Sequence, residues 1–131
     1  MKNFPFITAI ITLIIIIGGI FLFSPKNPQQ NQNNKSLPTN PSGYEFYWSL
    51  TCPHCENVEK FLTTWPKKDQ IVINKFEVNT DRNNALNLMK RAESCNVDKE
   101  SIGAVPLLYT PDGKCFLGDT PIIEYLDSLN I

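Results

Sequence analysis

The longest uninterrupted apolar pattern in the 131-residue chain lies near its N-terminus. Residues 6–23 carry no charge and leave no polar face on a helix. At ~1.5 Å per residue, such a helix reaches about 27 Å, close to the hydrocarbon thickness of a bilayer. The residues that follow form a poor signal-peptidase site. We therefore predict an uncleaved transmembrane helix within residues 1–23 in preference to a cleaved signal peptide.

A polar segment follows the predicted membrane helix. Residues 24–42 are rich in Pro, Asn, Gln and Lys and contain almost nothing apolar, which predicts a flexible linker. The lysines flanking the apolar run, Lys2 on one side and Lys26 with Lys35 on the other, do not fix its orientation. A very short N-terminal flank before a folded domain is typical of a signal-anchor. We expect a single-pass membrane protein whose domain lies outside the cytoplasm.

From residue 43 onward the pattern alternates between short apolar runs and apolar positions at helical spacing. The runs that predict strands are 44–48, 71–73 with 76–78, 105–110 and 114–117. Helical spacing is found in 58–65, 85–92 and 122–129. The order β-α-β-α-β-β-α predicts an α/β domain over residues 43–131, with a four-stranded mixed sheet flanked by helices.

Two details of these helices can be predicted as well. The last helix should be capped by Asp119 or Thr120, with Pro121 in its first turn. The second helix should begin after an N-cap within residues 79–81. Its predicted inner side consists of Ala85, Leu86, Leu88, Met89 and Ala92.

Composition narrows the range of functions. The formal net charge is −1 and the pI is about 5.8, so nothing indicates a nucleic-acid partner. The four cysteines are too few for a disulfide-scaffold protein, and two of them are closely spaced. This usage fits a redox centre or a metal site.

The closely spaced pair lies in the sequence Cys52-Pro53-His54-Cys55, between the first predicted strand and the first predicted helix. A cysteine at a helix N-terminus faces unpaired backbone N–H groups and the positive end of the dipole, and both favour a thiolate. Pro53 fits the first turn because it has no N–H, and a protonated His54 adds positive charge. Cys52 is therefore the candidate nucleophile, and Cys55 is the candidate resolving thiol.

The element order, this motif and a Val105-Pro106 pair about fifty residues later resemble the thioredoxin superfamily, most closely its minimal, glutaredoxin-like domains. The resemblance covers residues 44–131. It implies that Pro106 is cis and packs against the active-site sulfurs. The Val105 backbone would then lie beside Cys52 and pair with a bound cysteine-containing peptide. The alternative is an ordinary proline at the start of a strand.

The same resemblance extends to the periplasmic disulfide-forming oxidases, whose active site is Cys-Pro-His-Cys, and implies an oxidising couple tuned by His54. Three departures limit it. The helical insertion domain of those oxidases is absent. Phe46 stands where thioredoxins carry a buried acid, with Glu45 beside it pointing the other way, so the proton acceptor of Cys55 stays open. Ala104 and a single glycine at Gly118 do not support glutathione as an obligatory partner.

Cys95 and Cys115 are the remaining two of the four cysteines. One interpretation is two buried free thiols that act as small apolar residues. The other is a structural disulfide, because free thiols outside the cytoplasm tend to be oxidised. The sequence alone does not decide between them, since it does not give the separation of the two residues.

The first functional hypothesis is a membrane-tethered, extracytoplasmic thiol-disulfide oxidoreductase. It would be a monomer without a cofactor that exchanges disulfides with cysteines of exported proteins and is reset by a membrane redox partner. Whether it oxidises, reduces or isomerises is left open. A metal-binding or metallochaperone module would use Cys52 and Cys55 as half a site, but the chain lacks a second closely spaced pair, so we expect no metal. A redox-inert thioredoxin-fold adaptor is the third alternative.

Overall fold

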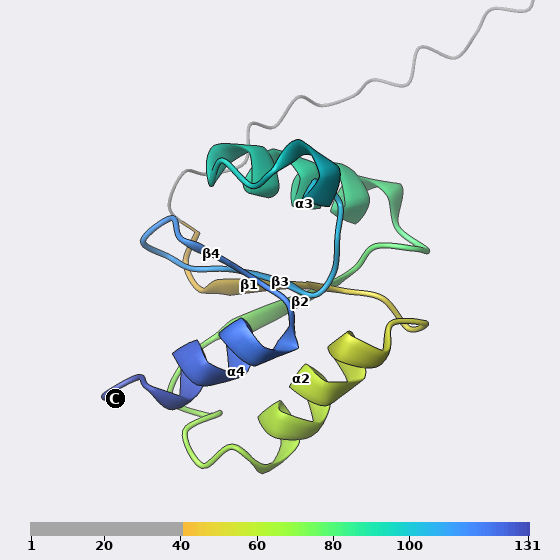
Figure 1. The fold of residues 1–131 in the computed structure, drawn as a ribbon. Coiled ribbons are helices and arrows are strands. Elements are labelled where there is room, and N and C mark those ends of the chain that lie inside the picture. Colours follow the sequence, from red (N-terminus) through yellow and green to blue (C-terminus); the bar gives the residue numbers. More distant parts are fainter. Residues whose placement is uncertain (1–40) are drawn as a thin grey trace, which may run out of the picture. The chain divides into compact units, whose positions relative to one another are not determined.

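A four-stranded sheet with helices on both faces makes up residues 41–131, the part of the chain that this computed structural model describes (Figure 1). The predicted membrane helix and nearly all of the predicted linker, 24–42, lie outside the described residues. Among the helices of residues 41–131, none has the length and apolar character needed to cross a membrane.

The sheet is built around β1, Tyr44–Trp48. β2, Ile73–Glu77, pairs with β1 in parallel, and β3, Leu107–Tyr109, pairs with its other side antiparallel. β4, Cys115–Leu117, is antiparallel to β3, which gives the strand order β2-β1-β3-β4. The predicted mixed sheet and the order β-α-β-α-β-β-α are confirmed. The fold is thioredoxin-like.

Three α-helices cover the two faces of this sheet. α2, Pro53–Thr64, and α4, Asp119–Asp127, lie on one face, and α3, Arg82–Ser94, lies on the other (Figure 1). A short 3-10 helix, Lys99–Ser101, follows α3. Because α2 connects two parallel neighbouring strands, it begins where β1 ends, and that end of the sheet carries the cysteine motif.

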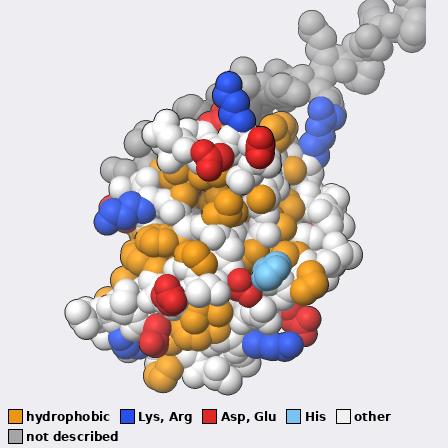
Figure 2. Space-filling view, in the orientation of Figure 1, with side chains coloured by type: hydrophobic (Ala, Val, Ile, Leu, Met, Phe, Trp, Pro, Cys, Tyr) orange, Lys and Arg blue, Asp and Glu red, His pale blue; other side chains and the backbone are white. Residues whose placement is uncertain are grey.

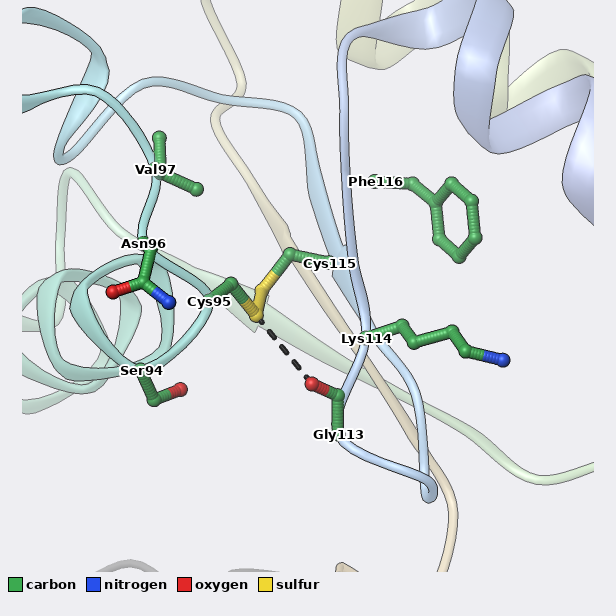
Figure 3. Close-up of a pocket in the computed structure, with 8 residues that line it drawn as sticks. All are labelled: Ser94, Cys95, Asn96, Val97, Gly113, Lys114, Cys115 and Phe116. Atoms are coloured by element: carbon green, nitrogen blue, oxygen red, sulfur yellow. Dashed lines mark hydrogen bonds between the residues drawn. A yellow bond between two sulfur atoms is a disulfide. The ribbon is translucent and has the colours of Figure 1, made fainter.

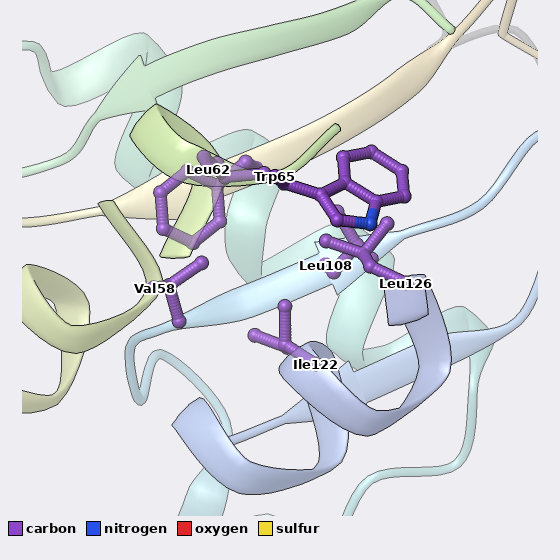
Figure 4. Close-up of a cluster of buried hydrophobic side chains, with 7 residues drawn as sticks. Val58, Leu62, Trp65, Leu108, Ile122 and Leu126 are labelled. Atoms are coloured by element: carbon purple, nitrogen blue, oxygen red, sulfur yellow. The ribbon is translucent and has the colours of Figure 1, made fainter. Parts of the chain in front are cut away.

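The face under α2 and α4 is almost wholly apolar. Side chains alternate along β1, so Phe46 points into this layer and its neighbours point away from it. Each large apolar side chain buried there contributes ~1.5–3 kcal/mol. The other buried members of the cluster, labelled in Figure 4, are Val58, Leu62, Trp65, Leu108, Ile122 and Leu126.

The face under α3 combines an apolar cluster with a buried ion pair. Arg91 Nε and Nη2 donate to the two carboxylate oxygens of Glu45 at 2.7 and 2.9 Å. Both residues are buried, with exposures of 4% and 6%. Tyr47 also donates to Glu45, and the Arg91 guanidinium lies 4.1 Å from the centre of the Tyr109 ring. Glu45 therefore points away from the Phe46 side of the sheet, as predicted.

The inner side of α3 differs from the prediction. Leu88 and Ala92 are buried, but Leu86 and Met89 are exposed. Arg91 takes the third buried position of the helix. The helix is rotated relative to the expected stripe because its last turn delivers the guanidinium to Glu45, and a buried cation needs such a partner.

The start of α4 also differs from the prediction. Neither Asp119 nor Thr120 is the N-cap, because the helix already begins at Asp119 and is preceded by Gly118. Gly118 has a φ of 94°, a conformation that glycine adopts without strain. The Asp119 side chain therefore does not cap α4, and its carboxylate contacts His54 and Asn57 of α2 instead. The predicted N-cap within 79–81 is Asp81, which accepts from the amides of Asn83 and Asn84.

Candidate active site

The junction between β1 and α2 is fixed by a small polar cluster. Ser49 is buried, and its carbonyl oxygen accepts from the Cys52 amide at 3.2 Å. Its hydroxyl accepts from Asn79 Nδ2 at 2.6 Å and lies 3.2 Å from the Thr51 hydroxyl. Sequence reasoning missed Ser49 and Asn79. The only signal for them was two polar residues at the carboxyl ends of β1 and β2, which parallel pairing places side by side.

Cys52 is the N-cap of α2, and its sulfur takes the place of a capping oxygen. The Cys52 Sγ accepts a hydrogen bond from the Cys55 amide at 3.2 Å. The side chain is partly exposed, so a substrate sulfur can reach it. An amide donor and the N-terminus of a 12-residue helix both favour negative charge on this atom.

Cys55 lies one turn further along α2 and is only 1% exposed. Burial is the main reason that the pKa of the Cys55 thiol is raised to about 12, and its hydrogen bond with Cys52 raises it further. Both cysteines are free thiols in this structure. The pair therefore combines an accessible sulfur with a buried one, the arrangement that a nucleophile and a resolving thiol require.

The loop before β3 brings a third component to the site. The Val105–Pro106 peptide bond is cis, Pro106 is buried, and the Cys52 thiol donates to the Val105 carbonyl oxygen at 3.6 Å. The Pro106 carbonyl oxygen accepts from the Gly118 amide at 2.9 Å, which ties the loop to the start of α4. Cys52 and Val105 are 53 positions apart in the sequence, and the fold brings them into contact.

His54 projects from the first turn of α2, and its side chain is 69% exposed. Figure 2 shows it, the only histidine of the chain, on the surface beside acidic and apolar groups. Its Nδ1 lies 3.1 Å from Oδ2 of Asp119, which also accepts from Asn57 Nδ2 at 2.7 Å. The Asn57 hydrogen bond and then His54 hold the pKa of Asp119 down at about 2. Within residues 41–131, no hydrogen bond joins the His54 ring to the Cys52 sulfur.

The second cysteine pair lies on the other face of the sheet. Cys95 and Cys115 form a disulfide with a Cα–Cα distance of 6.0 Å, which links the end of α3 to β4. The Cys95 sulfur lies 3.6 Å from the Gly113 carbonyl oxygen, a contact without a hydrogen because the sulfur is bonded (Figure 3). An open pocket of about 490 Å³ lies beside the disulfide and is lined by Ser94, Cys95, Asn96, Val97, Gly113, Lys114, Cys115 and Phe116.

The described residues contain no group of three or more His, Cys, Asp or Glu side chains placed to hold a metal ion. Comparisons of the chain with protein-family models, with curated proteins and with solved structures find no match. The thioredoxin-like fold and the geometry of the Cys52 and Cys55 pair are therefore the basis for the functional argument.

Proposed function

We propose that this protein is a membrane-tethered thiol-disulfide oxidoreductase that acts outside the cytoplasm on cysteines of exported proteins. One observation carries the proposal: the accessible Cys52 sulfur is held at the N-terminus of α2, with the buried Cys55 thiol one turn behind it. The Val105 carbonyl beside this sulfur supplies a backbone group for an incoming peptide.

The exchange proceeds in two steps at Cys52. In the oxidising direction, a substrate thiolate attacks the Cys52 sulfur of a Cys52–Cys55 disulfide, and the electron pair of the broken bond goes to Cys55, which takes up a proton. A second substrate thiolate then attacks the substrate sulfur of the mixed disulfide and releases Cys52. The substrate loses two electrons and two protons, and the protein gains them. Reduction of a substrate is the reverse sequence.

In the reducing direction, Cys55 must lose a proton before it attacks the mixed disulfide. Phe46 occupies the position from which thioredoxins offer a carboxylate, and Glu45 is paired with Arg91 on the opposite face. No carboxylate of the described residues is among the groups that shift the Cys55 pKa. The proton therefore passes to the departing substrate sulfur or to hydroxide, and the resolving step should accelerate as the pH rises, because the thiolate is the nucleophile.

Substrate binding uses the groups around the Cys52 sulfur. The Val105 backbone pairs with an extended segment of the substrate, in the manner of strand addition to a sheet edge. Leu50 is exposed two residues before Cys52 and offers an apolar contact at the rim of the site. The same geometry serves many substrates, because backbone pairing does not depend on the substrate's side chains.

Trapping of the mixed disulfide tests the proposal. A Cys55→Ala variant should accumulate mixed disulfides between Cys52 and exported proteins, because the resolving thiol is missing. Cys52→Ala is the matched control and should trap nothing. Traps in Cys52→Ala but not in Cys55→Ala would reverse the assignment, and no exchange with a small dithiol in the native protein would overturn the proposed activity.

The location of the domain is tested separately. The support is the uncharged run 6–23 followed by a polar segment. In intact cells, a membrane-impermeant maleimide should label Cys52 of the reduced protein, and the protein should stay in the membrane fraction. Labelling only after permeabilisation would place the domain in the cytoplasm and favour a reductase. The reduction potential of the Cys52–Cys55 couple then shows whether the pair is a strong or a weak oxidant, and the membrane partner that resets the protein determines the direction of electron flow in the cell.

A further inference from the structure

The first residue of α4 faces the active-site helix. Asp119 places one carboxylate oxygen between two donors of α2, His54 Nδ1 at 3.1 Å and Asn57 Nδ2 at 2.7 Å. Its other oxygen accepts from the Thr120 amide at 3.0 Å. Both donors that α2 supplies to this carboxylate thus lie at the N-terminal end of the helix, beside the cysteine motif.

We propose that Asp119 is a positioning residue that holds the His54 ring through Nδ1 and weakens the oxidising character of the Cys52–Cys55 couple. The inference rests on the proposed function, since it concerns the potential of the same couple. It gives His54 a partner in α4, at the ring nitrogen that makes no hydrogen bond to the Cys52 sulfur within residues 41–131.

The sign of the effect follows from the charges. Negative charge on Cys52 exists only in the reduced protein, so a protonated His54 stabilises the reduced form and makes the disulfide a stronger oxidant. A carboxylate that binds Nδ1 keeps this donor at Asp119 instead of at the Cys52 sulfur, and its own negative charge repels the thiolate. Because its pKa is held at about 2, Asp119 is ionised throughout the range in which the couple works. It therefore favours the oxidised form.

α2 itself carries a second acidic residue in its first turn. Glu56 lies in the same turn, but its carboxylate is bound to Lys60 at 2.8 Å and does not contact the ring. Glu56 and Asp119 thus carry the same charge at the same end of the molecule, and only Asp119 contacts His54. Glu56→Gln is consequently a matched control for Asp119→Asn.

Equilibration with glutathione measures the effect. The reaction converts the oxidised protein and two glutathione molecules into the Cys52 and Cys55 dithiol and one glutathione disulfide. Asp119→Asn should raise its equilibrium constant about two- to fivefold, the scale of an exposed ion pair. Since a tenfold change corresponds to ~30 mV, this is a shift of about 10–20 mV toward a stronger oxidant. Asp119→Glu should restore the native value, and Glu56→Gln should change it less than Asp119→Asn.

A double-variant cycle separates the effect through His54 from direct repulsion. In a His54→Ala background, Asp119→Asn should change the equilibrium constant less than it does in the native protein. An equal change in both backgrounds, or no change in the native background, would overturn the inference. These results leave the proposed function intact, which fails only if native protein does not exchange reversibly with glutathione or a dithiol.

Asn57→Ala is a second variant in case Asp119→Asn does not fold. It removes the neutral donor that shares the Asp119 oxygen and leaves the carboxylate more fully paired with His54. The equilibrium constant should then fall, the opposite of the Asp119→Asn effect. A rise in Asn57→Ala would contradict the role assigned to Asp119.

Discussion

The two cysteine pairs of this domain consist of the same residue type but differ in bonding and in their place in the fold. Cys52 and Cys55 are three residues apart in the first turn of one helix, are free thiols, and include an accessible sulfur. Cys95 and Cys115 are twenty residues apart, are bonded, and link α3 to β4 across the other face of the sheet. Position in the fold, and not residue type, distinguishes a reactive pair from a structural one.

The difference explains how one domain holds both pairs. A bond between Cys52 and Cys55 closes a loop inside a single helical turn, so its formation and cleavage constrain no other element. A bond between Cys95 and Cys115 closes a loop that contains the 3-10 helix, the cis-proline segment and β3. Loop closure of this length limits the unfolded chain and stabilises the fold. Redox cycling of Cys52 and Cys55, as proposed above, would therefore leave the Cys95–Cys115 bond and the elements that it links unchanged.

The largest expected effect separates the two pairs by activity. Cys52→Ala should abolish thiol-disulfide exchange and lower stability by no more than about 1 kcal/mol, the loss of one helix cap. The Cys95→Ala/Cys115→Ala double variant should retain exchange wherever it is folded. Both are measured by reduction of a model disulfide substrate and by urea unfolding. Loss of exchange in a folded double variant would show that Cys95 and Cys115 take part in the reaction.

The next effect concerns the polar layer under α3. Glu45→Gln leaves the buried Arg91 guanidinium without its charged partner and should lower the free energy of unfolding by about 3–5 kcal/mol. Glu93→Gln, an exposed change on the same helix, is the control and should stay within about 0.5 kcal/mol of the native value. Urea unfolding monitored by tryptophan fluorescence gives both values. Equal stability of the two variants would mean that the ion pair does not hold α3 to the sheet.

Removal of the disulfide should have a slightly smaller effect. For a loop of twenty residues, the chain-entropy relation predicts that Cys95→Ala/Cys115→Ala loses about 3 kcal/mol. Native protein unfolded in the presence of excess dithiol should approach the stability of the double variant. If the reduced native protein keeps its full stability, the Cys95–Cys115 bond is not a support of the fold.

The pH dependence of the resolving step gives a further contrast within the reactive pair. Burial is the largest cause of the raised Cys55 pKa and persists when Cys52 is bonded to a substrate, so the thiolate fraction of Cys55 should rise about tenfold per pH unit near neutral pH. Release of a chromophoric thiol from a mixed disulfide at Cys52 should accelerate accordingly between pH 7 and pH 9, followed by stopped-flow absorbance. Cys55→Ala is the control and should show no such release. A pH-independent rate in native protein would reveal a proton acceptor for Cys55.

The smallest effect is expected at low pH. Hydrogen bonds from Asn57 and His54 lower the pKa of Asp119 to about 2, below the ~3.9 of an unperturbed aspartate. A depressed folded-state pKa stabilises the fold above the unfolded value, and this contribution is lost as the pH falls from ~4 through 2. Asp119→Asn should therefore be less sensitive to acid than native protein in that window, as measured by unfolding midpoints. Parallel curves for the two proteins would contradict the depressed pKa.

The sequence predicted the parts of the fold that depend on short-range patterns. Alternation in β1 places Phe46 and Tyr47 on opposite faces, and helical spacing identifies α2 and α4. It also indicated Cys52 at a helix start, because a strand-to-helix junction at a Cys-Pro pair is a local feature. The resemblance to the thioredoxin superfamily then implied Val105 beside Cys52, a contact that the structure contains.

The features that sequence reasoning missed depend on contacts between distant residues. Arg91 is buried because it pairs with Glu45, which lies 46 positions earlier in the chain. A charged residue without such a partner is expected on the surface. The sequence predicts Asp119 or Thr120 as the cap of α4, but Gly118 takes that position, and the Asp119 carboxylate contacts residues 62 and 65 positions away. A local pattern cannot choose between a cap and a tertiary hydrogen bond of similar strength.

The strand order has one more consequence, which concerns association between copies of the domain. β2 and β4 are the two outer strands, and outer strands offer unpaired backbone groups to a strand of another molecule. β2 exposes Asn74 and the charged Lys75, which is paired with Glu59 of α2, and β4 has only three residues. A charged outer strand and a very short one are both poor templates for intermolecular sheet growth. Copies of this domain at high local concentration would thus be protected from edge-to-edge polymerisation.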